Sequence, residues 1–127
     1  MFHALPIRIL IADDHLFIRE GLAAVLGRQP DMKIVAQAAD GEEAINLFRL
    51  CRPDVSLMDL RMPGIDGIEA TRTICEEFPL ACILLFTTYC DNTEVASVLR
   101  AGAKGHLLKE SSCEELLSTI RSVHSTA

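Results

Sequence analysis

Charged and hydroxyl residues follow four of the short apolar runs in this sequence. In chain order they are Asp13 with Asp14, Asp59, Thr87 and Lys109. Carboxylates gathered at one place repel one another, by on the order of 4 kcal/mol for a pair about 4 Å apart at an effective dielectric constant of about 20. A hard divalent cation relieves this repulsion, and Mg²⁺ suits the purpose because it accepts a few carboxylates and keeps waters that a phosphoryl oxygen can replace. These residue types predict metal-dependent phosphoryl chemistry if the fold brings them together.

Asp59 is the candidate nucleophile of this group. A carboxylate can attack a phosphoryl donor and become an aspartyl phosphate. A metal held by Asp13, Asp14 and Asp59, together with the ammonium group of Lys109, would offset the negative charge on the transferring group. The hydroxyl of Thr87 could donate a hydrogen bond to a phosphoryl oxygen.

A turning loop is expected directly after Asp59, because residues 61–67 contain one proline and two glycines. Such a loop can aim a backbone carbonyl at the metal, and the carbonyl of Arg61 is the candidate ligand. Arg61 and Tyr89 stand two residues beyond Asp59 and Thr87. We expect their side chains to tune hydrolysis by controlling the access of water.

The apolar runs alternate with stretches of helical periodicity, which is the pattern of a repeated βα unit. The expected strands are 7–12, 32–36, 55–58, 82–86 and 105–108. The first, third and fourth are almost continuously apolar, as central parallel strands covered on both faces would be, and the second and fifth look like edges. We expect the flavodoxin-like (βα)5 fold of the α/β class, a doubly wound five-stranded parallel sheet in the order 2-1-3-4-5. In that order the carboxyl ends of the strands bring the five site residues to one edge.

Helix starts and stops support this division of the chain. Asp40 with Glu43, and Ser112 with Glu115, have the spacing of capping boxes, in which side chains satisfy free backbone N–H groups. Gly102 is placed to end the fourth helix. His15 stands at a helix start, where we expect packing or capping rather than catalysis.

Composition limits the classes of function. At 127 residues, half of them hydrophobic, the chain fits one domain over 1–127 with its core at about 7–124. There are 18 acidic and 12 basic residues, giving a net charge of −6, and the basic residues are scattered. Unaided nucleic-acid binding is therefore disfavoured, because affinity for phosphates needs concentrated positive charge.

Targeting and redox signals predict a cytoplasmic protein without a membrane partner. Apolar runs fall short of the roughly 20 residues that span a bilayer, and the first residues lack the basic start of a signal peptide. The five cysteines have no C-x-x-C spacing, and we expect them to be reduced and mostly buried.

Several stretches together resemble the receiver domains of two-component response regulators. They are Ile11-Ala12-Asp13-Asp14-His15, the run from Leu57 to Gly67, Thr87 after an apolar strand, and the run from Gly105 to Lys109. The likeness covers nearly the whole chain. Segments 14–22 and 107–111 are similar to the LuxR/NarL-type subgroup, whose members join the receiver to a DNA-binding helix-turn-helix domain.

The resemblance implies phosphorylation of Asp59 by a sensor histidine kinase. It also implies a Mg²⁺ ion bound by Asp13, Asp14, Asp59 and the carbonyl of Arg61. Signalling would run through Thr87 and a nearby ring, and here His106 stands where the family usually has Tyr or Phe. A homodimer on phosphorylation is compatible with the family. DNA would be bound only through an output domain, which we expect to be absent because Ala127 falls about where the linker begins in that subgroup.

Two alternatives come from other classes of function. A phosphohydrolase can also pass through an aspartyl phosphate, but such enzymes need a second acid two residues after the nucleophile, and Asp59-Leu60-Arg61 lacks it. The second alternative is an interaction module that has the receiver fold and is never phosphorylated. The receiver interpretation makes the chain a phosphoacceptor with self-catalysed steps rather than an enzyme with a released product.

Overall fold

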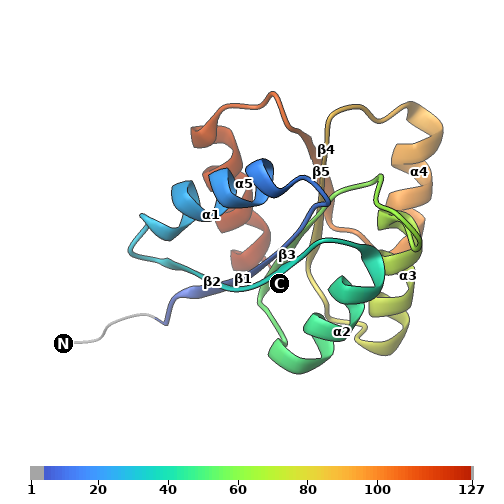
Figure 1. Ribbon diagram of the computed structural model, residues 1–127, viewed down its shortest axis with the longest axis horizontal. Coiled ribbons are helices and arrows are strands. Elements are labelled where there is room, and N and C mark those ends of the chain that lie inside the picture. The colour runs from blue at the N-terminus through green and yellow to red at the C-terminus, as the bar shows by residue number, and fades with distance from the viewer. Residues whose placement is uncertain (1–4, 127) are drawn as a thin grey trace.

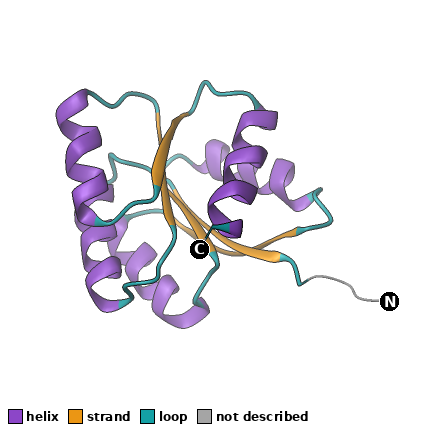
Figure 2. Ribbon diagram, turned by 180° about the vertical axis from the view of Figure 1, so that it is seen from behind, coloured by secondary structure: helices purple, strands orange, loops and turns teal. Residues whose placement is uncertain are grey.

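Strands and helices alternate along residues 5–126, the part of the chain that the computed structural model describes. These residues form one parallel sheet in the order β2-β1-β3-β4-β5, with helices on both faces (Figures 1 and 2). The elements are β1 (Ile7–Ala12), α1 (Leu16–Gly27), β2 (Met32–Ala38), α2 (Gly41–Cys51), β3 (Val55–Met58), α3 (Gly67–Glu77), β4 (Ile83–Thr87), α4 (Asn92–Ala101), β5 (Gly105–Leu108) and α5 (Cys113–Ser125). The predicted flavodoxin-like fold and strand order are confirmed.

Two apolar layers hold the sheet between its helices. Helices α1 and α5 cover one face, and α2, α3 and α4 cover the other (Figure 1). Successive side chains of β1 point to opposite layers, as in any strand. Ile9 and Ile11 join the cluster that contains Leu116 and Ile120 of α5. Leu10 joins the cluster on the opposite face. The central strands are therefore buried on both sides, which explains their continuous apolar runs.

The register of the strands aligns their carboxyl ends. Ala12 of β1 pairs with Met58 of β3, so Asp13 and Asp59 follow the two strands side by side. The amide of Asp59 donates a hydrogen bond to the carbonyl of Ala12 at 2.9 Å. At the other side of the site, the amide of Lys109 donates to the carbonyl of Thr87 at 2.8 Å. Backbone pairing alone thus brings these residues to one edge.

Two strands, β2 and β4, have bounds that differ from the prediction. Strand β2 continues to Ala38, and β4 runs over Ile83–Thr87, so that Thr87 is its last residue instead of the residue after it. The difference at β4 follows from its pairing with β5, because Thr87 pairs in register with Leu108. A hydroxyl residue can therefore remain part of the ladder while facing the site.

The helix starts were predicted in part. The side chains of Asp40 and Ser112 accept hydrogen bonds from the amides of Glu43 and Glu115, as expected. The carboxylate of Glu43, however, accepts from the amide of Ala39 instead of completing the box at Asp40. A complete capping box occurs at Asp91 and Glu94 of α4, whose D-x-x-E spacing is visible in the sequence and was overlooked.

The cysteines are free, as expected, but the prediction that most are buried was wrong. Cys82 is buried, Cys51, Cys75 and Cys90 are partly exposed, and Cys113 is exposed. Cys113 is the first residue of α5 and lies outside both apolar clusters.

Within residues 5–126, every helix is too short or too polar to cross a membrane.

Gly67 connects the loop after Asp59 to α3. Its amide donates to the carbonyl of Leu60 at 2.8 Å, so the loop closes tightly on the backbone. A Cβ atom placed on Gly67 would lie 2.1 Å from the carbonyl oxygen of Asp59. Any side chain here must push the Asp59 backbone away from its present position.

Gly67→Ala should therefore destabilise the protein, whereas the matched substitution Gly21→Ala should not. A Cβ at Gly21 meets no atom within 4 Å, and alanine favours the helix there. We expect urea unfolding to show a loss of about 1–3 kcal/mol for Gly67→Ala and a gain of up to about 1 kcal/mol for Gly21→Ala. Equal effects of the two substitutions would contradict the close approach at Asp59.

Candidate functional site

An acidic cluster lies at the carboxyl ends of β1 and β3. Asp13 and Asp59 are almost fully buried, with 1% and 4% of their surface exposed, whereas Asp14 and His15 are exposed. One ligand atom from each of these four residues lies within 4.8 Å of the others. The structure thus brings together the predicted carboxylates, and it adds a histidine that was predicted only to pack or cap.

Lys109 forms ion pairs with both buried carboxylates. Its Nζ lies 2.5 Å from Oδ2 of Asp13 and 3.2 Å from Oδ2 of Asp59. Oδ2 of Asp13 is buried and accepts no hydrogen bond from the described residues, so its polar contact is the ion pair with Lys109. A buried carboxylate oxygen is costly without a cation beside it. A metal ion bound at this edge could share that role with the lysine.

The electrostatics of Asp59 favour a bound cation. Burial raises the pKa of the Asp59 carboxyl above its ordinary value, and the charge of Asp13 raises it further. Lys109 opposes both effects but does not cancel them, and Asp14 adds a smaller repulsion. The ionised form of Asp59 is consequently disfavoured in the metal-free fold. Hard oxygen donors around a buried negative charge fit Mg²⁺, which prefers such ligands.

A cavity of about 370 Å³ opens beside Asp59, on the side of β4 and β5. It is lined by His15, Asp59, Arg61, Thr87, Thr88, Tyr89 and Lys109. Thr87 is 2% exposed, and its hydroxyl donates to the carbonyl of Tyr89 at a long distance of 3.4 Å. Thr88 is a second hydroxyl residue of the lining that sequence reasoning missed. A cavity with a carboxylate, an ammonium group and hydroxyls can hold a small anionic group such as a phosphoryl group.

Arg61 bridges the loop after Asp59 to the start of α4. Its Nη1 donates to the carbonyl of Tyr89 at 2.9 Å, and its Nη2 lies 3.0 and 2.8 Å from the two carboxylate oxygens of Glu94. Glu94 also belongs to the capping box of α4 with Asp91. The guanidinium of Arg61 therefore pairs with Glu94 and not with the acidic cluster, and the residue lines one side of the cavity. Glu94 was not predicted as part of this site.

His106 lies apart from this arrangement. It is exposed on the edge strand β5, where it pairs in register with Leu85. It belongs neither to the acidic cluster nor to the lining of the cavity. The structure thus places His106 outside the site, and its role as a switch ring stays a prediction.

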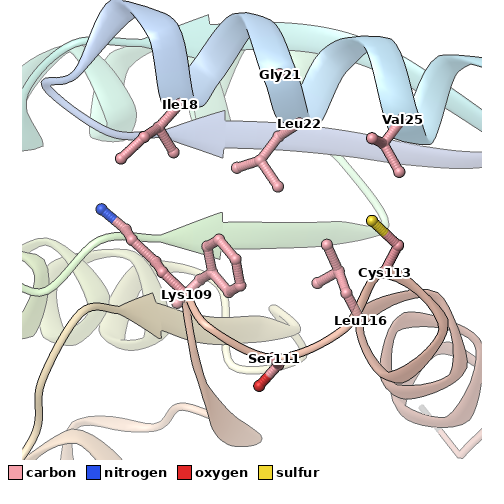
Figure 3. A pocket seen from close by; sticks show the side chains of 9 residues that line it. Ile18, Gly21, Leu22, Val25, Lys109, Ser111, Cys113 and Leu116 are labelled. Atoms are coloured by element: carbon pink, nitrogen blue, oxygen red, sulfur yellow. The ribbon is translucent and has the colours of Figure 1, made fainter.

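A second hollow of about 360 Å³ lies between α1 and α5 (Figure 3). Ile18, Leu22 and Val25 of α1 line one wall, and Leu116 of α5 lines the other. Its lining is mostly apolar, and the side chain of Lys109 lies at one end (Figure 3). Lys109 is therefore shared between this groove and the acidic cluster.

The chain has recognisable relatives. A family model for the response regulator receiver domain matches residues 9–121. The chain is similar to the transcriptional regulatory protein LiaR of Bacillus subtilis, with 46% identity over 115 residues, 91% of this chain and 54% of that protein. It spans about half the length of the curated relatives that it matches.

Solved structures show the same likeness. A LuxR-family two-component response regulator from Aurantimonas sp. SI85-9A1 superposes with a TM-score of 0.91 and 39% identity, over 95% of this chain and 86% of that chain. A chain of the CheX-CheY-BeF3-Mg²⁺ complex from Borrelia burgdorferi gives a TM-score of 0.88 and 28% identity, over 94% of this chain and 90% of that chain.

Asp59→Asn should stabilise the metal-free protein at neutral pH, because it removes a buried anion that folding disfavours. The pKa of Asp59 is raised in the folded state. At pH values below the ordinary pKa of a carboxyl, Asp59 therefore does not lower the free energy of unfolding. The loss of stability grows as the pH rises through the raised pKa of the folded state, because the buried carboxyl must then ionise. In thermal unfolding with a chelator, we expect Asp59→Asn to melt a few degrees higher than the wild type at about pH 7, and the difference to shrink toward about pH 4.

The control is Glu76→Gln, which neutralises an exposed carboxylate on α3. This variant should show no comparable gain. A lower melting temperature for Asp59→Asn, or the same gain in both variants, would contradict the assigned electrostatics.

Proposed function

Since the chain belongs to the response regulator receiver domain family, in its LuxR/NarL-type subgroup, we propose that Asp59 accepts a phosphoryl group from a histidine kinase in a Mg²⁺-dependent step. The observation that carries the proposal is the contact of one lysine, Lys109, with two buried carboxylates, Asp13 and Asp59. A carboxylate whose charge is only partly compensated, at the wall of a cavity, is placed to attack an electrophile, and a phosphoryl group is the electrophile that the family transfers.

In the proposed step, a carboxylate oxygen of Asp59 forms a bond to phosphorus while the bond from phosphorus to the donor's leaving group breaks. The leaving group takes up a proton, and Asp59 becomes an aspartyl phosphate. The ammonium of Lys109 offsets charge on the phosphoryl oxygens, and the hydroxyl of Thr87 donates to one of them. Burial of Asp59 excludes bulk water from the attacking oxygen.

Asp13, Asp14 and Asp59, with the carbonyl of Arg61, are the residues that would hold Mg²⁺. The buried Oδ2 of Asp13, which accepts no hydrogen bond and contacts only a cation, supports this assignment. When bound, the ion supplies positive charge that lowers the repulsion between the carboxylates and the incoming phosphoryl group. The similar chain from the CheX-CheY-BeF3-Mg²⁺ complex of Borrelia burgdorferi belongs to an assembly that contains Mg²⁺, which supports a metal-dependent step.

Thr87 is the proposed link between phosphorylation and the output surface. Its hydroxyl makes a long hydrogen bond with the carbonyl of Tyr89, and a phosphoryl oxygen would be a stronger acceptor. Turning toward that acceptor would release the loop before α4 and favour another arrangement of the α4 and β5 face. His106 lies on β5 within that face, and we propose that its ring responds to the change.

The partners follow from the family. Receiver domains interact with histidine kinases, and curated relatives such as LiaR are transcriptional regulatory proteins. We propose a cytoplasmic regulator whose receiver, residues 1–127, controls transcription through a helix-turn-helix output domain, with dimerisation on phosphorylation as one route. DNA contact would belong to that output domain.

The two alternatives receive less support. A phosphohydrolase needs a second acid two residues after the nucleophile, and Arg61 at that position forms an ion pair with Glu94 instead. An interaction module that is never phosphorylated would have no need for the buried contact between Asp59 and Lys109, which costs desolvation energy. We therefore assign the chain as a phosphoacceptor and not as an enzyme that releases a product.

Incubation with acetyl phosphate should add one phosphoryl group to the protein, as measured by intact mass. The adduct should require Mg²⁺ and should be missing from Asp59→Asn. Asp31→Asn is the matched control, because Asp31 is a carboxylate that pairs with Arg121 away from the acidic cluster. This control should be phosphorylated normally. The absence of an adduct under every condition would favour the interaction module.

Arg61 and Tyr89 should control how long the aspartyl phosphate survives. Arg61 closes one side of the cavity through Tyr89 and Glu94, so Arg61→Ala should admit water and shorten the lifetime several-fold. Tyr89→Ala and Glu94→Gln, which opens the ion pair, should change it in the same direction. Arg72→Ala is the control, since Arg72 pairs with Glu69 on the surface of α3. Unchanged lifetimes in all the site variants would remove the tuning role.

A further inference from the structure

His15 places a nitrogen atom within the acidic cluster. Its Nδ1 lies 3.0 Å from Oδ1 of Asp13 and 3.1 Å from Oδ1 of Asp14. His15 is the residue before α1, yet its side chain accepts no hydrogen bond from the helix amides. The expected capping role is therefore not what orients the ring.

The backbone holds the ring in this position. The amide of His15 donates to Oδ1 of Asp13 at 2.8 Å, which fixes the turn between β1 and α1. Arg19, one turn into α1, donates from Nη1 to the carbonyl of Asp13 at 2.7 Å. These contacts fix His15 beside the carboxylates before any ligand binds. The side chain of His15 is 64% exposed, so the site can be reached from solvent.

The spacing of these atoms matches the coordination sphere of an octahedral metal ion. Ligands on adjacent positions of an octahedron with bonds of about 2.1 Å lie roughly 3.0 Å apart. Both distances from Nδ1 to the carboxylate oxygens fall at this value. Nδ1 of His15 and the two carboxylate oxygens therefore stand at the spacing of adjacent ligands of one ion.

We propose that His15 is a direct metal ligand. The pocket consequently binds divalent metals that prefer imidazole, such as Ni²⁺, more tightly than a pocket of oxygen ligands alone would. The inference rests on the metal pocket of the proposed function. Imidazole nitrogen suits Ni²⁺, Co²⁺ and Zn²⁺, whereas Mg²⁺ prefers oxygen and keeps its waters. Ligation through Nδ1 uses the tautomer that carries its proton on Nε2.

Two consequences separate this role from a structural one. A ring that merely donates a hydrogen bond to Asp13 would support every metal equally by ordering the carboxylates. A ring that ligates the ion supports Ni²⁺ and leaves Mg²⁺ nearly unaffected. Affinities for the two ions must therefore respond differently to the loss of the imidazole.

Calorimetric titration of the full chain with Ni²⁺ and with Mg²⁺ tests the proposal. His15→Gln should weaken Ni²⁺ binding by at least about tenfold and change Mg²⁺ binding by less than about twofold. His124→Gln is the matched control, because His124 lies in the last turn of α5 outside the cluster, and it should alter neither affinity. Pulsed electron paramagnetic resonance of the Mn²⁺-loaded wild type should show coupling to a nitrogen that His15→Gln abolishes.

Other results overturn the proposal. Equal losses for both ions, or no loss for Ni²⁺, would leave His15 with a structural role. Suppose that Mg²⁺ binds and supports the phosphoryl adduct, but that the affinity for Ni²⁺ is the same in His15→Gln as in the wild type. The His15 inference alone then fails. If the wild type binds neither ion, the metal pocket of the proposed function fails with it.

Discussion

Two carboxylates buried beside each other are the constraint on which the rest of this structure depends. Asp13 and Asp59 follow neighbouring parallel strands, and both are almost inaccessible to solvent. Burial of like charges is unfavourable, and the ammonium of Lys109 offsets it incompletely, as the raised pKa of Asp59 shows. The sheet imposes this arrangement because strands β1 and β3 are fixed in register by buried apolar side chains. The core thus stabilises a site that is unfavourable by itself, and a bound cation would offset the repulsion between its carboxylates.

The loops around the site are held by contacts that connect Asp59 to the start of α4. Gly67 lies against the carbonyl of Asp59, and Arg61 connects the same loop to Glu94 at the start of α4. Glu94 serves the capping box and the ion pair with one carboxylate. Two residues, Arg61 and Glu94, thus connect the loop after Asp59 to the first turn of α4. The hydrogen bond of Thr87 with Tyr89 reaches the same loop from β4.

The parts that could be predicted from the sequence are those set by periodicity and by strand ends. The apolar runs predicted every strand. The carboxyl ends of parallel strands meet at one edge of a sheet, and this rule predicted that Asp13, Asp59 and Lys109 lie together. Contacts that depend on rotamers and on loop paths could not be predicted in this way. His15 reaches the cluster through the turn between β1 and α1, and Arg61 reaches Glu94 across more than thirty residues of chain. The exception is the D-x-x-E box of α4, which spacing alone could have identified.

Lys109 links the chemistry of the site to a surface that takes no part in it. Its ammonium contacts Asp13 and Asp59, while its side chain lies at the end of the apolar groove between α1 and α5 (Figure 3). The three donors of the ammonium lie on one nitrogen, so a phosphoryl oxygen added at Asp59 would compete with the two carboxylates for the same positive charge. The groove and the acidic cluster therefore share a side chain, whose ammonium pairs with Asp59 while the same residue lines the groove of α1 and α5.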